Sequence, residues 1–272
     1  SPSYLGALNA FNAYQPKFVE VPTDNGGLIP EELDKILETT PNCKFIYVIP
    51  DFQNPTGRTW SMERRQKFME VVNKHNLPVL EDNPYGELRY EGEILPSLKS
   101  MDTKGLVMFL GTFSKIFCPG LRLGWIAAEH SLLSEFVKIK QSADLHTSNF
   151  DQGVADAYME QYDLDEHVKE IVALYKHRRD LILESMEKYF PAGTEWTHPE
   201  GGLFLWLTFP EGVSARKVFN KCIEMKVAGV IGDAFYPNQK TDRSMRINYS
   251  NMPDNRIVEG IQRMAKAIKE CM

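Results

Sequence analysis

The stretch GTFSK at residues 111–115, followed by PGLRLGW at residues 119–125, decides how the rest of the chain is interpreted. The apolar run LVMFL at residues 106–110 leads into it and predicts a buried strand. Lys115 therefore stands just past a strand end, where a charged amine is poorly solvated. Because burial disfavours the ammonium form, the Lys115 amine is predicted to act as a nucleophile near neutral pH.

The residues around Lys115 indicate a phosphate site. Thr112 and Ser114 offer hydroxyl donors and Arg122 offers a planar guanidinium, a set suited to a phosphate dianion. A lone lysine is usually a solvated surface charge, so a catalytic role for Lys115 is inferred from the residues around it. A lysine beside phosphate donors predicts a phosphorylated aldehyde held as a Schiff base, and that aldehyde is pyridoxal 5'-phosphate (PLP).

Two further strands are predicted upstream, and each runs into a polar cluster. The run FIYVIP at residues 45–50 leads into DFQNPTGR at residues 51–58, and LPVL at residues 77–80 leads into EDNPY at residues 81–85. Open α/β sheets bind ligands at the carboxyl ends of their strands. Either cluster alone is adequately explained as a turn. Both together, each at a strand end, favour a ligand site.

With these motifs the chain resembles the fold-type I PLP-dependent aminotransferases of class I/II. The FQNPTG motif at residues 52–57 makes it most similar to the 2-aminoadipate and kynurenine aminotransferase branch. The resemblance implies an α/β, three-layer PLP-dependent transferase fold, with a partial large domain built on a mainly parallel sheet and a smaller C-terminal α+β domain. It also implies a homodimer that transfers the amino group of an α-amino acid to a 2-oxo acid acceptor.

The resemblance assigns roles around the cofactor. It implies that Lys115 binds PLP covalently, that Asp82 pairs with the pyridine nitrogen, and that Tyr85 donates to the phenolic oxygen, which makes these three the catalytic residues. Asn54 is implied to bind the same oxygen. The peptide bond between Asn54 and Pro55 is expected to be cis. Arg122 is implied to bind the phosphate.

The resemblance also implies roles at the two ends of the chain. Arg246, in MRINYS at residues 245–250, is implied to bind the substrate α-carboxylate together with Asn54. Tyr4, in SPSY at residues 1–4, is implied to stack on the cofactor. Thr112 takes the place of the family's first serine and keeps its hydroxyl, beside Ser114.

Members of that family carry a further stretch before this point, which includes a Gly-rich phosphate loop. The glycine pairs at residues 26–27 and 201–202 lack the polar residues of such a loop and read as turns. We therefore expect an N-terminally truncated piece, inactive by itself and with weakened affinity for the cofactor.

Strands and helices alternate along the chain, which predicts a sheet covered on both faces. A long amphipathic helix at residues 165–189 is predicted to connect two domains, 1–164 and 165–272. Lys115 would lie in the first and Arg246 in the second, so that domain closure on the substrate would exclude water. Further helices are expected at residues 30–37, 61–75, 129–142, 215–226 and 254–270, and further strands at residues 202–207, 227–231 and 245–249.

Composition excludes several other classes of protein. The net charge is −6 with no basic stripe, so nucleic acid binding through this segment is not expected. No apolar run is long enough to span a bilayer, and no signal peptide is visible. The four scattered cysteines indicate a reducing cytoplasm, and the histidines form no metal motif.

Two alternatives remain open from the sequence. One is an aminotransferase-like sensor domain of a winged-helix transcriptional regulator, which the sequence before Ser1 would reveal. The other is a PLP lyase or decarboxylase on the same fold. An oxo acid product that depends on an added oxo acid acceptor would separate transamination from elimination.

Overall fold

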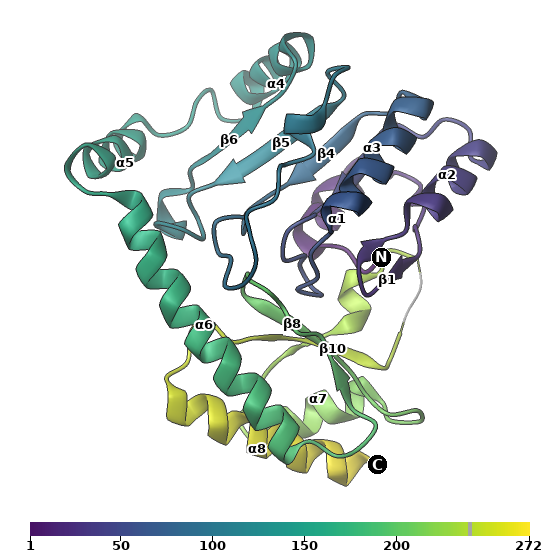
Figure 1. The fold of residues 1–272 in the computed structure, drawn as a ribbon, viewed down its shortest axis with the longest axis vertical. Coiled ribbons are helices and arrows are strands. Elements are labelled where there is room, and N and C mark those ends of the chain that lie inside the picture. The colour runs from purple at the N-terminus through teal and green to yellow at the C-terminus, as the bar shows by residue number, and fades with distance from the viewer. Residues whose placement is uncertain (239–240) are drawn as a thin grey trace.

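The computed structural model describes residues 1–238 and 241–272. The first half of the chain is built on a four-stranded, mainly parallel sheet (Figure 1). The strands are β3 (Ile46–Val48), β4 (Val79–Asp82), β5 (Val107–Thr112) and β6 (Gly124–Ala127), in that spatial order. The first three pair in parallel, and β6 pairs with β5 in antiparallel fashion. The parallel sheet predicted from three apolar runs is confirmed, and the ends of each strand differ from the predicted ones by one or two residues.

Helices α2 (Pro30–Thr39) and α3 (Met62–His75) cover one face of this sheet. Phe68 and Val72 of α3 pack against the inward residues of the strands, Val79 and Val107 among them. The predicted cap of α3 is confirmed, because the Ser61 hydroxyl accepts a hydrogen bond from the backbone N–H of Arg64 at 3.2 Å.

The opposite face of the sheet carries α1 (Leu5–Asn12), a helix that was not predicted. Phe11 of α1 meets the ring of Tyr47 edge to face, with centroids 5.6 Å apart. A short hairpin of β1 (Thr23–Asp24) and β2 (Gly27–Leu28) follows. A cavity of about 570 Å³ lies between β3, at the edge of the sheet, and the extended residues 16–21.

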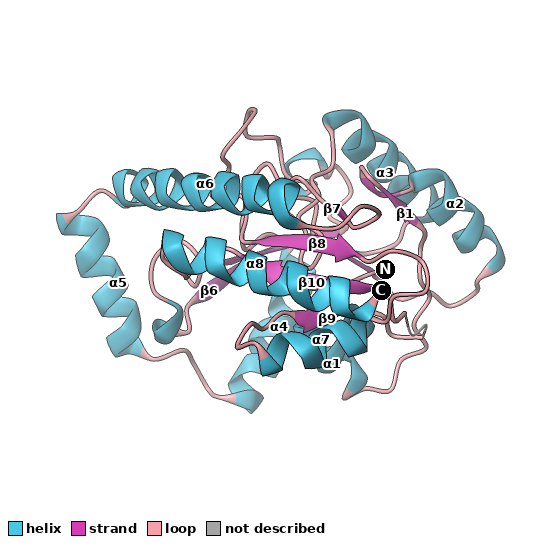
Figure 2. Ribbon diagram, turned by 90° about the horizontal axis from the view of Figure 1, so that it is seen from below, coloured by secondary structure: helices cyan, strands magenta, loops and turns pink. Residues whose placement is uncertain are grey.

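The second half of the chain is built on an antiparallel sheet of β7 (Glu195–Trp196), β8 (Phe204–Thr208), β10 (Ser244–Asn248) and β9 (Val230–Ile231). Figure 2 shows α6 (Leu164–Tyr189) and α8 (Asp254–Cys271) lying side by side over β8 and β10, with α7 (Ala215–Glu224) next to α8. Their shared core includes Met186, Leu205, Leu207, Met245 and Ile261. The smaller α+β unit expected from the sequence is therefore present.

Helix α6 joins the two halves. Its first turns pack with a third core in which Ile49, Phe52 and Tyr85 of the first half meet Leu203 and Phe204 of the second. Its last turns pack in the core of the antiparallel sheet. Because α6 begins at Leu164, we propose that the domain boundary lies there, with residues 1–164 before it and 165–272 after it.

Helices α4 (His130–Ala143) and α5 (Asn149–Gln161) extend away from β6 towards the start of α6 (Figure 1). The first was predicted and the second was not. No residue of α4 is buried, and exposed apolar side chains occur on both helices, among them Ile139 and Phe150.

Candidate active site

The predicted site residues gather where the carboxyl ends of β3, β4 and β5 face the second sheet. Asp82 is the last residue of β4 and Thr112 the last residue of β5. Asp82 therefore lies inside its strand, not after it as the sequence suggested, because β4 pairs with β5 as far as Leu110. Asn54 lies in the turn that follows β3.

Asn54 is a buried link between the two halves of the chain. Its side-chain N–H donates to the Tyr85 hydroxyl at 3.4 Å, and its oxygen accepts from the Arg246 guanidinium at 2.8 Å. The peptide bond between Asn54 and Pro55 is cis, as expected. Gln53 and Thr56 hydrogen-bond each other across the same turn, so the Asn54 side chain stands on an ordered loop.

Asp82 and its neighbour Glu81 point to opposite faces of the sheet, as successive residues of a strand must. Glu81 is buried on the α3 side, where it accepts hydrogen bonds from the backbone N–H groups of Leu98 and Lys99, each at 2.8 Å. Asp82 faces the site, and its Oδ2 accepts from the Tyr47 hydroxyl at 2.6 Å. Burial raises the pKa of the Asp82 carboxyl, and the hydrogen bond from Tyr47 opposes that rise.

Lys115 lies in the turn after β5, half-buried. Burial lowers the pKa of its ammonium group, and the charges of Arg122 and Arg246 lower it further. Within residues 1–238 and 241–272, the Lys115 amine takes part in no hydrogen bond or ion pair. The nucleophilic role of Lys115 stays a prediction.

The predicted phosphate ligands differ in the hydrogen bonds that they already make within the chain. The Thr112 hydroxyl accepts from the backbone N–H of Ser114 at 3.1 Å and lies 3.0 Å from the carbonyl of Leu123. It therefore orders the turn that carries Lys115. Arg122 is exposed, has a left-handed backbone with φ of 57°, and donates to the carbonyl of Pro119 at 3.0 Å. Phosphate binding by Thr112, Ser114 and Arg122 stays a prediction.

Tyr85 is buried on the site side of β4 and meets Phe204 edge to face, with centroids 6.0 Å apart. Burial raises the pKa of the Tyr85 hydroxyl, which therefore remains a hydrogen-bond donor at neutral pH. Tyr4 precedes α1 and is 38% exposed. Its ring lies directly over Gly6, where a side-chain carbon would come within 2.5 Å of it. The stacking role of Tyr4 stays a prediction.

Arg246 extends from β10 of the second half towards the strand ends of the first. Its guanidinium carbon lies 4.1 Å from the ring centroid of Phe204 and 5.1 Å from that of Phe235. Two aromatic rings and the Asn54 amide therefore contact the guanidinium and restrict its position. Carboxylate binding by Arg246 stays a prediction.

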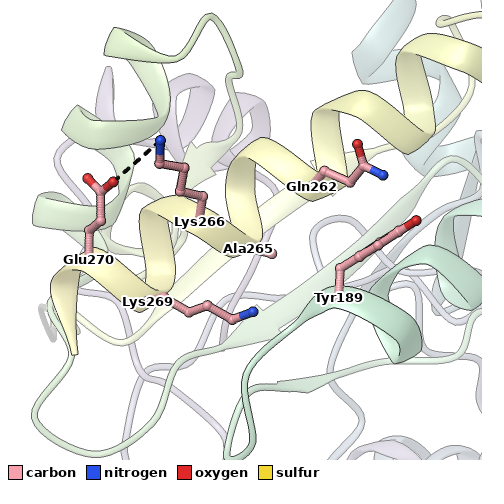
Figure 3. A pocket seen from close by; sticks show the side chains of 6 residues that line it. All are labelled: Tyr189, Gln262, Ala265, Lys266, Lys269 and Glu270. Atoms are coloured by element: carbon pink, nitrogen blue, oxygen red, sulfur yellow. Dashed lines mark ion pairs between the residues drawn. The ribbon is translucent and has the colours of Figure 1, made fainter.

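A separate hollow of about 390 Å³ lies on α8 beside the end of α6 (Figure 3). It is lined by Tyr189, Gln262, Ala265, Lys266, Lys269 and Glu270, and Lys266 pairs with Glu270 at 3.9 Å. None of these residues belongs to the predicted site.

Residues 1–238 and 241–272 contain no group of three or more His, Cys, Asp or Glu side chains able to hold a metal ion. Nor do they contain a helix both long enough and apolar enough to cross a membrane.

Residues 1–264 match the family model described as aminotransferase class I and II. The chain belongs to this family. The aromatic-amino-acid aminotransferase 1 of Thermococcus litoralis is 43% identical to it, over 100% of this chain and 66% of that protein. The chain thus spans about two thirds of the length of this relative.

Two solved structures of family members have the same fold. The Pyrococcus horikoshii kynurenine aminotransferase, in complex with PMP, is 41% identical with a TM-score of 0.95, over 99% of this chain and 68% of that one. LysN, the α-aminoadipate aminotransferase of Thermus thermophilus, is complexed with N-(5'-phosphopyridoxyl)-L-leucine. It is 32% identical with a TM-score of 0.95, over 100% of this chain and 70% of that one.

In this aminotransferase-family chain, three residues of the site were missed by sequence reasoning. Tyr47 lies within an apolar run and looked like a core residue. Phe204 and Phe235 are buried aromatic residues whose contact with Arg246 depends on the packing of separate elements. Only the alternation of β3 gave a signal, since it sets Tyr47 on the face opposite Ile46 and Val48.

Proposed function

We propose that the intact protein is a PLP-dependent aminotransferase that moves an amino group from an α-amino acid to a 2-oxo acid. One observation carries the proposal: Arg246 of the second half reaches Asn54 of the first at 2.8 Å, on the side of the sheet where Lys115 and Asp82 lie. A guanidinium for a carboxylate and an amine of lowered pKa are what this chemistry requires.

The residues present fit PLP. In the described part of the chain, Oδ1 of Asp82 accepts no hydrogen bond, and it would hold the ring nitrogen. Asn54 and Tyr85 would bind the phenolic oxygen, Thr112, Ser114 and Arg122 the phosphate, Tyr4 the ring face, and Lys115 would bind the aldehyde carbon. When bound, PLP supplies the electron sink that stabilises negative charge at the substrate Cα.

The protein's own contribution is to hold the substrate and to move one proton. Once the substrate amine has displaced it from the cofactor, the free Lys115 amine would take the proton from the substrate Cα as a general base, and its lowered pKa favours the neutral form that accepts a proton. Arg246 binds the α-carboxylate through two parallel hydrogen bonds and so orients the Cα–H bond. Because these two residues lie on different halves of the chain, bound substrate draws the halves together and excludes water.

Replacing Arg246 by Lys should raise the KM for the amino acid by about 10- to 100-fold, because a planar fork is lost while the charge is kept. Steady-state kinetics of the intact protein would measure this, and the visible absorption of bound cofactor should stay unchanged. Arg256→Lys, on the exposed face of α8, is the matched control. An unchanged KM in the Arg246 variant would mean that the carboxylate binds elsewhere.

The function itself is tested by supplying an amino donor with and without a 2-oxo acid acceptor. Aromatic amino acids, 2-aminoadipate and kynurenine are the donors to try first, because relatives are named for them. Oxo acid that exceeds one equivalent per chain only when the acceptor is present supports transamination, because bound PLP can take one amino group by itself. Repeated turnover without acceptor would indicate the lyase alternative, and ligand binding without turnover would indicate the sensor alternative.

We also propose a homodimer in the reducing cytoplasm. The exposed apolar side chains of α4 and α5 offer surface for a second subunit. Cys43, Cys118, Cys222 and Cys271 are all free thiols, which agrees with a reducing compartment.

A further inference from the structure

Tyr47 is a polar residue in an otherwise apolar strand. Its neighbours Ile46 and Val48 point into the core beneath α3, so the Tyr47 side chain points to the face that carries the site. It pairs with Leu80 in β4, two residues before Asp82, which places Tyr47 and Asp82 on the same face. The hydroxyl lies 2.6 Å from Oδ2 of Asp82.

The contacts around Tyr47 hold its side chain in the orientation that makes this hydrogen bond. Phe11 meets the Tyr47 ring edge to face, and Phe45 meets Phe11 in the same manner with centroids 5.2 Å apart. Among the residues that the structure describes, Asp82 is the sole hydrogen-bond partner of the hydroxyl. The ring is therefore supported by aromatic contacts while the hydroxyl is committed to one carboxylate oxygen.

The charges around the pair keep the proton on Tyr47. Burial, and next the negative charge of Asp82, raise the pKa of the Tyr47 hydroxyl well above its usual value. Tyr4 and Tyr85 are the other titratable groups close to it, and both act in the same direction. Tyr47 is thus a donor throughout the neutral range, and Asp82 is the acceptor.

We propose that Tyr47 is a positioning residue for Asp82: its hydroxyl occupies Oδ2 and so presents Oδ1 to the ring nitrogen of the cofactor. This inference rests on the proposed function, since it assigns Oδ1 to PLP. A half-buried carboxylate without this donor would turn more freely and would take up a proton more readily. In this inference Tyr47 acts through Asp82, the partner of its hydroxyl.

Tyr47→Phe removes the hydroxyl and keeps the ring, whereas Phe11→Leu removes the aromatic support and keeps the hydroxyl. In the ligand-free protein, a carbon-13 NMR titration of the Asp82 carboxyl should show its pKa raised in Tyr47→Phe. The same pKa should change less in Phe11→Leu, because the Tyr47 hydroxyl is kept. A role for Tyr47 in packing alone would not move the carboxyl titration, so an unchanged Asp82 pKa in Tyr47→Phe overturns the inference.

Titration with PLP, followed by visible absorption, gives the second readout. Affinity should fall about 10-fold in Tyr47→Phe, as expected for one lost hydrogen bond to a charged group. In an Asp82→Asn background, the same change should have no further effect on affinity. An equal loss in both backgrounds would show that Tyr47 acts independently of Asp82 and would overturn the inference. Failure of the unaltered protein to bind PLP would contradict the proposed function, and the NMR titration would still decide the role of Tyr47.

Discussion

Replacing Lys115 by Ala should lower the rate of transamination by about 1,000-fold or more. A positioned general base commonly contributes 100- to 10,000-fold, and Lys115 is also the residue proposed to hold the cofactor. Its lowered pKa depends on burial and on Arg122 and Arg246, so no other lysine can easily take its place. Turnover of the intact protein, measured at saturating donor and acceptor, would give the size of the effect.

The control for this change is Lys138→Ala on the exposed surface of α4, where Lys138 pairs with its neighbour Glu135. That variant should retain normal turnover. Circular dichroism should show that both variants are folded. A Lys115→Ala protein with a tenth or more of the original rate would rule out Lys115 as the catalytic base.

Replacing Asp51 by Ala should destabilise the protein by about 3–5 kcal/mol, because it leaves a buried charge without its partner. Asp51 accepts from Arg65 at 2.6 Å and from Arg89 at 3.3 Å, and the Arg65 side chain is 0% exposed. Asp51 also begins the turn that carries Asn54, so the loss should loosen the site. Urea unfolding followed by circular dichroism would measure the change in free energy.

The control is Glu135→Ala, which breaks an ion pair between two exposed side chains and should leave the urea midpoint nearly unchanged. The double variant Asp51→Leu/Arg65→Met replaces the buried pair by apolar groups and should recover part of the lost stability. If Asp51→Ala unfolds at the same urea concentration as the unaltered protein, the buried pair does not support the turn.

Much of the first half of the fold follows from local sequence signals. Three apolar runs, each followed by a polar cluster, predicted β3, β4 and β5 and the edge at which they end. The Ser61 cap fixed the start of α3, because a hydroxyl just before an amphipathic run satisfies backbone N–H groups of the first turn. These features depend on neighbours close in the sequence, which is why they could be predicted.

The elements that were missed have weaker or interrupted signals. Helix α1 has no side-chain cap at its start and includes Gly6. Helix α5 is capped by the Ser148 hydroxyl, but Gly153 in its interior lowers its helix propensity. Strand β6 is only four residues long and is largely exposed, so apolar periodicity does not reveal it. Each of these elements is fixed mainly by the parts of the chain against which it lies.

In the candidate site, too, local motifs predicted the residues but not the contacts between them. The motifs identified Lys115, Asp82 and Asn54 as chemistry-bearing residues, but distances between them are properties of the fold. The hydrogen bond of Arg246 to Asn54 joins residues 192 positions apart, and the contact of Tyr47 with Asp82 joins two neighbouring strands. Such long-range contacts have no local sequence signal.

To test whether Lys115 holds the cofactor, the intact protein would be incubated with PLP and reduced with borohydride, and the labelled peptide would be mapped. Reduction makes the link between the cofactor and its amine permanent. We expect one phosphopyridoxyl group per chain, on Lys115, in the peptide that contains residues 111–115. A label on another lysine, with Lys115 unmodified, would contradict the account.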